Sequence, residues 1–285
     1  MSYISPVITL TTDFGTNDAY VASMKGVILS INPSAVIVDI CHMIEPQNIA
    51  QAAFILNTTH PYFPEGTIHV AIVDPGVGSK RKAIILKTPR AFFIAPDNGI
   101  LSYIVDELCP RHTKPPSQGS LNHESRELGT GAEAIAVTNP HIWNQSISTT
   151  FHGRDIFAPV AARLSLGVPC HEFGESISSV DVFPIPQPYL DAKGDLIGHI
   201  LHIDHFGNLI TNIKHSDLTP EANVIIEIGK HHIHGLSHFY AQEEGLSAII
   251  GSSNYLEISL KNSNAAAFID AKVSAEIRVR PTDGE

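Results

Sequence analysis

The chain has 285 residues, of which 43% are apolar and only 16% are charged. This composition excludes an intrinsically disordered chain and predicts a compact protein of about two domains. A formal net charge of −11 disfavours nucleic-acid binding, because phosphate backbones attract basic surfaces.

Three features of the chain bear on its location. The three cysteines are widely spaced and form no CxxC pair, which argues against a disulfide framework or a thiolate zinc site. No segment approaches the roughly 18 consecutive apolar residues of a membrane span, and the N-terminus lacks the pattern of a cleaved signal. We therefore expect a cytoplasmic protein that does not enter a membrane.

The first part of the chain predicts alternating strands and helices. Apolar, β-branched runs predict strands at Val7–Thr12, Ala35–Cys41, Ile68–Asp74, Ala83–Lys87 and Phe92–Ala95. Apolar residues at helical spacing predict helices that begin near Asp18, Ile49 and Leu101. A βαβαβ order favours parallel pairing, so we expect an N-terminal α/β domain with a mainly parallel sheet over residues 1–182. The polar segment Thr113–Thr130 has no periodicity and predicts a loop.

The second part of the chain has a different character. The prolines of PIPQPY, Pro184, Pro186 and Pro188, predict a stiff extended segment at which the domains divide. Beyond it, short alternating runs predict strands at Leu196–Ile203, Leu209–Ile213, Val224–Ile228, Leu246–Ile250, Leu256–Leu260 and Val273–Val279. We expect a smaller C-terminal β-barrel or sandwich domain over residues 190–285.

Two carboxylates lie where predicted strands end. Asp13 follows the first strand, and Asp74 ends the apolar strand with which the run AIVDPGVGSKR begins. Ligands of parallel α/β sheets bind beyond the carboxyl ends of the strands, so we expect both side chains to line one crevice. The Asp13 carboxylate could accept hydrogen bonds from two ribose hydroxyls, and capping of a turn or helix is an equally weighted alternative.

Asp74 is followed by a glycine-rich turn and an arginine. PGVGSKR matches neither phosphate-binding glycine motif, so a phosphate site is disfavoured. Gly76 and Gly78 would instead permit a bend that returns Arg81 towards Asp74, although an arginine in KRK is often only a solvated charge. His152, in TFHGRDIF, stands at the start of a predicted helix, where it could face a ligand or be structural.

The remaining candidates have ordinary explanations as well. The repeats HILHIDH and HHIH suggest a metal site, but histidines three apart on a strand point to opposite faces, so we expect no metal. Asp204 and Asn208 flank a glycine turn suited to an ammonium group and a heterocycle edge, or to a plain hairpin. The turns SSNY and NSNAA could present backbone groups to an adenine, or simply join strands.

Six separated motifs, in this order, resemble those of one family: TTDFGTNDAYVASMKGVI, VDPGVGSKR, APDNGIL, FHGRDIFAPVAA, DHFGNLITNI and NSNAAA. Together they look like the S-adenosyl-L-methionine (SAM) hydroxide adenosyltransferases, also called SAM hydrolases, which are relatives of fluorinase and chlorinase. The resemblance covers nearly the whole chain. Asp74, Arg81 and His152 coincide with the Asp-Arg-His set of that family.

The resemblance implies a reaction in which water or hydroxide attacks C5′ of the SAM ribose and expels L-methionine, leaving adenosine, with no cofactor. Asp74, Arg81 and His152 would be catalytic, with the general base open between His152 and Asp74. The implied substrate-binding residues are Asp13, Phe14, Phe151, Gly153, Asp204, Asn208, Ser252, Ser253, Tyr255, Asn264 and Ala266.

Within that set, the resemblance assigns parts of SAM to different residues. Asp13 would hold the ribose diol and Phe151 would pack on the ribose or adenine. Asp204 and the Ser252–Ser253 turn would hold the methionine ammonium and carboxylate, whereas Asn208 and the Asn264–Ala266 backbone would contact the adenine. Gln47 stands where the resemblance implies an aromatic residue.

Alternative functions follow from the same residues. The halogenating relatives carry an aromatic residue in place of the motif carboxylate and no matching histidine, so Asp74 and His152 favour the hydrolase branch over a halide-dependent 5′-halogenase. A SAM- or adenosine-binding sensor without turnover and a metal-dependent hydrolase are further alternatives. Family likeness also implies a homotrimer with sites between subunits.

Overall fold

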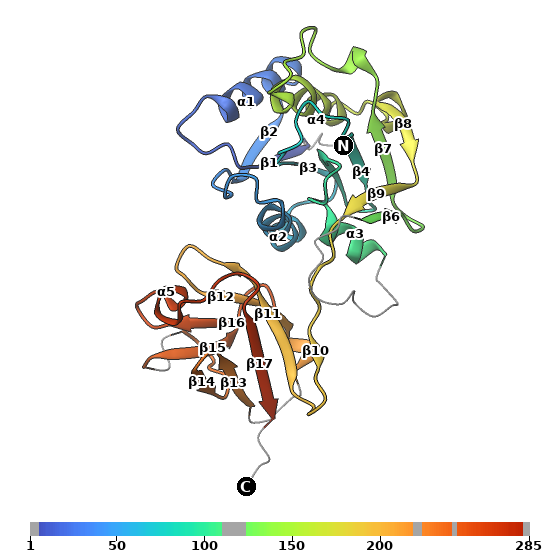
Figure 1. The fold of residues 1–285 in the computed structure, drawn as a ribbon. Coiled ribbons are helices and arrows are strands. Elements are labelled where there is room, and N and C mark those ends of the chain that lie inside the picture. Colours follow the sequence, from blue (N-terminus) through green and yellow to red (C-terminus); the bar gives the residue numbers. More distant parts are fainter. Residues whose placement is uncertain (1–5, 110–123, 219–223, 241–243, 282–285) are drawn as a thin grey trace. The chain divides into compact units, whose positions relative to one another are not determined.

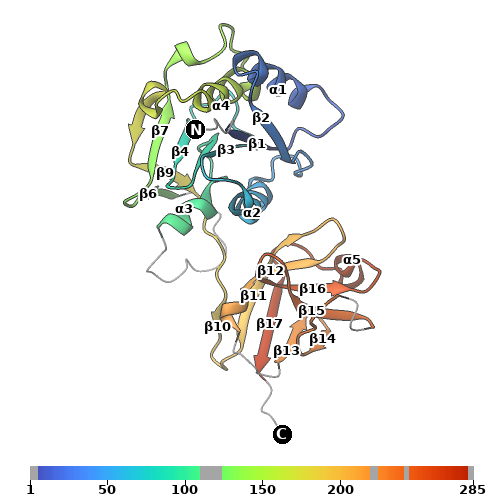
Figure 2. The same cartoon turned by 180° about the vertical axis from the view of Figure 1, so that it is seen from behind.

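The computed structural model of the chain describes residues 6–109, 124–218, 224–240 and 244–281. The chain divides into two compact units, Met1–Ile185 and Pro186–Glu285, and each is described here by itself (Figures 1 and 2). The division falls inside the proline-rich segment PIPQPY, where the missing N–H groups and fixed φ of proline disfavour regular structure.

The first unit is built on a seven-stranded sheet in the order β2-β1-β3-β5-β4-β7-β8. Its strands are β1 (Val7–Thr12), β2 (Val36–Cys41), β3 (Thr67–Ile72), β4 (Ala83–Lys87), β5 (Ala91–Pro96), β7 (Glu133–Val137) and β8 (Gly174–Ile177). The α/β class is confirmed, but the sheet is mixed rather than mainly parallel. The pairings β2-β1, β1-β3 and β3-β5 are parallel, whereas β5-β4, β4-β7 and β7-β8 are antiparallel. The short connection between β4 and β5 requires this change, because a parallel pair needs a long crossover.

Helices cover both faces of this sheet (Figures 1 and 2). One face packs against α1 (Tyr20–Ile31) and α4 (Ala158–Ser165), and the other packs against α2 (Ile49–Thr59) and α3 (Ser102–Leu108). Alternation along β3 supplies both cores, since Val70 belongs to the α1/α4 side and Ala71 to the α2/α3 side. Short 3₁₀ turns lie at His60–Tyr62, Pro140–Ile142 and Cys170–Glu172.

A two-stranded ribbon in this unit contradicts part of the expected loop. β6 (Glu124–Glu127) pairs antiparallel with β9 (Ser179–Val182), so the prediction of a loop over Thr113–Thr130 is wrong at these four residues; residues 110–123 lie outside the described part. The sequence ESRE has no apolar alternation, so the strand depends on backbone pairing with β9. Arg126 also donates from Nη1 to Asp106 Oδ1 at 2.8 Å, which joins the ribbon to α3.

The second unit is an antiparallel, nearly closed barrel, which is one of the two β architectures predicted for it. Its strands are β10 (Tyr189–Leu190), β11 (Leu196–Ile203), β12 (Leu209–Lys214), β13 (Val224–Ile228), β14 (His231–His234), β15 (Leu246–Ile250), β16 (Tyr255–Leu260) and β17 (Glu276–Pro281). The sheet runs β14-β13-β17-β11-β12-β16-β15, and a bridge from Ser237 to Ile249 links its two ends. The sequence did not predict β10, β14 or the short helix α5 (Ala265–Ile269). A 3₁₀ turn, His215–Asp217, follows β12. No helix in the described residues is long and apolar enough to cross a membrane.

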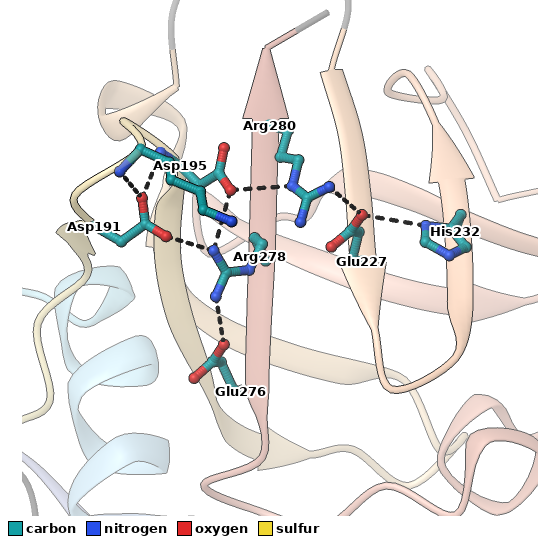
Figure 3. Close-up of polar contacts among 8 residues, drawn as sticks. Asp191, Asp195, Glu227, His232, Glu276, Arg278 and Arg280 are labelled. Carbon is teal, nitrogen blue, oxygen red and sulfur yellow. Dashed lines mark hydrogen bonds and ion pairs between the residues drawn. The ribbon is translucent and has the colours of Figure 1, made fainter.

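An ion-pair network covers the outer face of β17 in the barrel (Figure 3). Its labelled members are Asp191, Asp195, Glu227, His232, Glu276, Arg278 and Arg280. Arg278 Nη1 lies 2.5 Å from Asp191 Oδ2 and 3.1 Å from Asp195 Oδ2. The network therefore joins the turn between β10 and β11 to the last strand of the barrel.

Candidate active site

Two acidic residues lie beyond the carboxyl ends of neighbouring strands in the first unit. β1 and β3 pair in parallel with Thr12 opposite Ile72, and the chain continues from these strands to Asp13 and Asp74. Both carboxylates therefore lie at the same edge of the sheet, which is where ligands bind in α/β folds. Asp13 Oδ2 accepts a hydrogen bond from the backbone N–H of Gln47 at 2.8 Å.

Asp74 and Arg81 form a buried two-point ion pair. Arg81 donates from Nε to Asp74 Oδ1 at 2.9 Å and from Nη2 to Asp74 Oδ2. The Arg81 side chain is only 10% exposed and that of Asp74 only 6%, and the guanidinium carbon lies 5.4 Å from the centre of the Phe157 ring. Arg81 is therefore not a solvated surface charge. A guanidinium fork matched to a carboxylate in this way holds both groups in one orientation.

The glycine-rich turn brings this pair towards the segment that carries the histidine. Gly78 has a φ of +79°, and a Cβ at this position would lie 2.8 Å from the Thr149 carbonyl oxygen. Only glycine tolerates both that backbone conformation and so close an approach. The backbone N–H of Arg81 donates to Ser79 Oγ at 3.2 Å, which closes the turn.

His152 completes the set. It precedes a π-helical turn, η3 (Gly153–Phe157), and its Nδ1 lies 2.9 Å from Arg81 Nη2. A guanidinium can only donate, so Nδ1 is the acceptor and the proton of the neutral imidazole is on Nε2. Burial, together with the positive charge of Arg81, lowers the pKa of His152 below the ordinary 6.5. At neutral pH the imidazole therefore presents an N–H donor at Nε2.

A buried carboxylate holds this turn in place. Asp155 is 1% exposed and accepts hydrogen bonds from the Ser148 N–H at 2.8 Å and from the Arg154 side chain at 2.7 and 2.9 Å. Burial opposes ionisation of Asp155, but the bonds from Arg154, Ser148 and Asn144 outweigh it and lower its pKa. The segment before His152 is thus tied to the turn after it. Isolated π-turns are frequent at functional sites.

Aromatic rings surround the start of this turn. The Phe14 ring centre lies 5.8 Å from that of Phe151, and Tyr20, which is 48% exposed, lies 5.1 Å from Phe151. A Cβ on Gly153 would lie 3.1–3.3 Å from Phe151, Met24 and Phe14, so glycine allows the rings to approach. Phe14, Phe151 and Gly153 were predicted from the sequence to bind substrate, whereas Tyr20, which lies beside Phe14 and Phe151, was not among the predicted residues.

Four other predicted residues gather at one end of the barrel. Asp204 Oδ1 accepts from the backbone N–H of Asn208 at 2.8 Å, and Asp204 Oδ2 accepts from Asn208 Nδ2 at 2.9 Å. The backbone N–H of Ala266 donates to the Gly207 carbonyl at 2.9 Å. Asn264 caps α5, since its Oδ1 accepts from the Ala267 N–H at 2.7 Å. These contacts join the turn 204–208 to α5.

The Ser252–Ser253 pair lies in the hairpin turn between β15 and β16. The Asn254 N–H donates to the Gly251 carbonyl at 2.9 Å across this turn. Tyr255, the first residue of β16, is buried, and Lys214 Nζ lies 5.9 Å from the centre of its ring. These contacts are those of a hairpin turn, in which Ser252 is exposed.

A buried acid beside this turn escaped the sequence analysis. Glu257 is 5% exposed, and Tyr240 donates its hydroxyl proton to Glu257 Oε2 at 2.8 Å. Burial, and to a smaller degree the Asp204 charge, raises the pKa of Glu257. The signal in the sequence was a single acid within the otherwise apolar strand YLEISL. Among the described residues, no three His, Cys, Asp or Glu side chains form a group that could hold a metal ion.

The two units match the two domains of one known protein family. Residues 8–174 match the SAM hydroxide adenosyltransferase N-terminal domain, and residues 198–278 match the C-terminal domain of that family. A solved structure of an uncharacterised conserved protein from Thermotoga maritima is similar, with a TM-score of 0.82, 32% identity and coverage of 95% of this chain and 99% of that one.

Curated relatives extend over almost the full length. The (R)-S-adenosyl-L-methionine hydrolase of Methanocaldococcus jannaschii is 33% identical over 97% of this chain and 96% of its own, and that of Salinispora arenicola is 30% identical over 96% and 98%. The fluorinase of Nocardia brasiliensis is 29% identical over 75% of this chain and 73% of its own. The chain therefore belongs to the SAM hydroxide adenosyltransferase family.

Proposed function

We propose that this protein hydrolyses SAM to adenosine and L-methionine. An oxygen of water or hydroxide forms a bond to C5′ of the ribose while the C5′–S bond breaks and its electron pair returns to sulfur. Methionine leaves as a neutral thioether, and one proton is released per turnover. Because a cationic sulfonium becomes neutral, a site that excludes bulk water lowers the barrier if it also aligns the two reactants.

The observation that carries the proposal is the contact of Arg81 with both Asp74 and His152. Two of its nitrogens bind the Asp74 carboxylate and one also contacts His152 Nδ1, so the three groups form one unit. That contact directs the proton of neutral His152 to Nε2. Water is a poor nucleophile, and a positively charged arginine with an imidazole N–H can stabilise the hydroxide-like oxygen that attacks.

This arrangement favours a donor role for His152 over that of a general base. Nδ1 already accepts from Arg81, so it is not available to take a proton from water while the contact persists. Asp74 likewise receives two bonds from Arg81. We infer that Asp74 orients Arg81 and that Arg81 and His152 bind the nucleophile. No cofactor is needed for this chemistry.

Chromatography of reaction mixtures tests the proposal directly. Chelator-treated protein incubated with SAM should release adenosine and methionine in equal amounts without added halide. His152→Ala and Arg81→Ala should each lower kcat by about 10²- to 10³-fold, as losses of a preorganised donor do. His141→Ala is the matched control, because His141 is an exposed histidine of the same unit, and it should leave kcat unchanged.

The same experiment separates the alternatives. A 5′-halogenated adenosine formed only with chloride or fluoride would establish a halogenase instead. SAM that binds in calorimetry but stays intact would indicate a sensor, and activity lost on chelation would indicate a metal-dependent hydrolase. Since the hydrolase relatives are named for the (R) epimer, we propose that the R sulfonium is preferred, and separated epimers test this.

We further propose a cytoplasmic homotrimer. Phe206, Phe239 and Phe268 of the barrel are 58–73% exposed, and burial between copies would remove this apolar surface from water. Light scattering at working concentration should give three times the mass of one chain, and a monomer would refute the assembly.

A further inference from the structure

One turn contacts both ends of the segment that carries Asp74 and Arg81. The side chain of Asn98 donates from Nδ2 to the carbonyl of Val73, which precedes Asp74, at 2.8 Å. The backbone N–H of Asp97 donates to the carbonyl of Lys82, which follows Arg81, at 2.9 Å. The turn 96–99 therefore closes the segment 74–81 at both ends.

These two bonds extend the sheet beyond its regular ladders. β4 and β5 end with Ala83 opposite Pro96, so the bond from Asp97 continues that ladder by one step. β3 and β5 pair only as far as Val70 and Ile94. Asn98 therefore supplies a side-chain donor to the Val73 carbonyl, where the backbone ladder has already ended.

The turn is itself held firmly. Asn98 Oδ1 accepts from the backbone N–H of Ile100 at 3.3 Å, which orients the carboxamide with its nitrogen towards Val73. Asp97 is 8% exposed and accepts a bond from the Asp181 N–H in β9 at 2.8 Å. Because the turn is anchored to β9, the hydrogen bond from Asn98 can restrict movement of the strand end that carries Asp74.

We propose that Asn98 is a positioning residue for the reaction: its carboxamide, through the Val73 carbonyl, holds Asp74 where that carboxylate receives both bonds from Arg81. The inference rests on the proposed function. Asn98 does not touch the reacting atoms; it acts on Asp74 and, through Arg81, on His152. Losing the donor should therefore lower kcat with little effect on the KM for SAM.

The test uses N98A, N98D and a matched control, N139D. Asn139 makes the same two contacts elsewhere in this unit, donating from Nδ2 to the Glu172 carbonyl at 2.7 Å and accepting from the His141 N–H at 3.1 Å. N98A and N98D should lower kcat by about 10-fold or more, since small misplacements of reacting groups cost that much, while KM changes less than about 3-fold. N139D should retain the wild-type kcat.

The pH profile distinguishes positioning from general loosening of the fold. A protonated carboxyl can donate to the Val73 carbonyl, whereas a carboxylate cannot. The deficit of N98D relative to wild type should therefore shrink as the pH falls, and the deficit of N98A should not change. A kcat of N98A within about 2-fold of that of N139D would overturn the inference, as would equal losses in N98D and N139D.

An NMR titration keeps this test independent of turnover. If wild-type protein does not hydrolyse SAM, the proposed function fails, and the His152 imidazole then serves as the reporter. If Asp74 no longer holds Arg81 against His152 Nδ1 in N98A, the positive charge of Arg81 lowers the His152 pKa less, and that pKa should rise even though burial, the larger cause, persists. An unchanged His152 pKa in folded N98A would overturn the positioning role, whether or not SAM is the substrate.

Discussion

Replacing Gly78 with alanine should lower kcat, because the new side chain displaces the turn between Asp74 and Arg81. Gly78 has a φ of +79°, and its new Cβ would lie 2.8 Å from the Thr149 carbonyl oxygen, whereas ordinary contact begins at 3.4 Å. The turn must therefore move by about 0.6 Å, which is 3.4 minus 2.8 Å. A misplacement of 1 Å can cost about 100-fold, so we expect kcat to fall by about 10-fold.

Gly66 provides the matched control for this substitution. It has a φ of +80°, but a Cβ there meets nothing within 4 Å, and it precedes β3 at the end opposite Asp74. Gly66→Ala should lose about 1–2 kcal/mol of unfolding free energy in urea, because alanine must adopt the left-handed conformation, and Gly78→Ala should lose more because its Cβ also meets the Thr149 carbonyl. Adenosine release at saturating SAM should fall only in Gly78→Ala. Equal kcat values in the two variants would refute the reasoning.

Three further results are expected. The acid limb of kcat/KM should lie below pH 6.5, because burial and Arg81 lower the pKa of His152, and a limb at or above 6.5 in a pH–rate profile would contradict this. Burial lowers the pKa of His69 to about 3, so between pH 6.5 and 3 the unfolded chain binds a proton that the folded protein does not. The free energy of unfolding should therefore decrease as the pH falls through that window, by up to about 1.4 kcal/mol per pH unit. His69→Phe, which keeps the stacking on Phe93, should show a shallower pH dependence in urea unfolding, and an unchanged slope would exclude His69 as the cause. Arg278→Gln should lower the urea midpoint for unfolding of the barrel, because it removes the contacts to Asp191 and Asp195 (Figure 3). The difference in midpoint from wild type should be smaller in high salt, which screens these ion pairs. A midpoint equal to that of wild type would mean that the network does not stabilise the barrel.

Local patterns were sufficient for most strands and helices of the core. β1, β4, β11, β13 and β15 have the predicted bounds, because each is a continuous or alternating apolar run that tolerates only one secondary structure. β6 to β10 and β14 were not predicted. Of these, ESRE in β6 and HHIH in β14 have no apolar alternation and exist as strands only because a neighbour pairs with them. The antiparallel half of the first sheet also depends on pairing, which periodicity does not reveal.

The residues of the candidate active site also differ in how far the sequence alone predicted their proximity. Asp74 and Arg81 are seven residues apart, so the glycine-rich turn in the sequence already predicted their approach. His152 is 71 residues from Arg81, and residue type alone favoured a structural role for it. The six motifs of the family, in order, placed it in the set before any geometry was known.

The sequence by itself determined the family, because motif order is a property of the chain, and it predicted the division into two domains and the candidate set Asp74, Arg81 and His152. Only the tertiary structure decided which nitrogen of His152 carries the proton, and that Asn98 binds the carbonyl next to Asp74. Hydrogen bonds between residues distant in the chain depend on how strands and turns pack, so no local pattern encodes them.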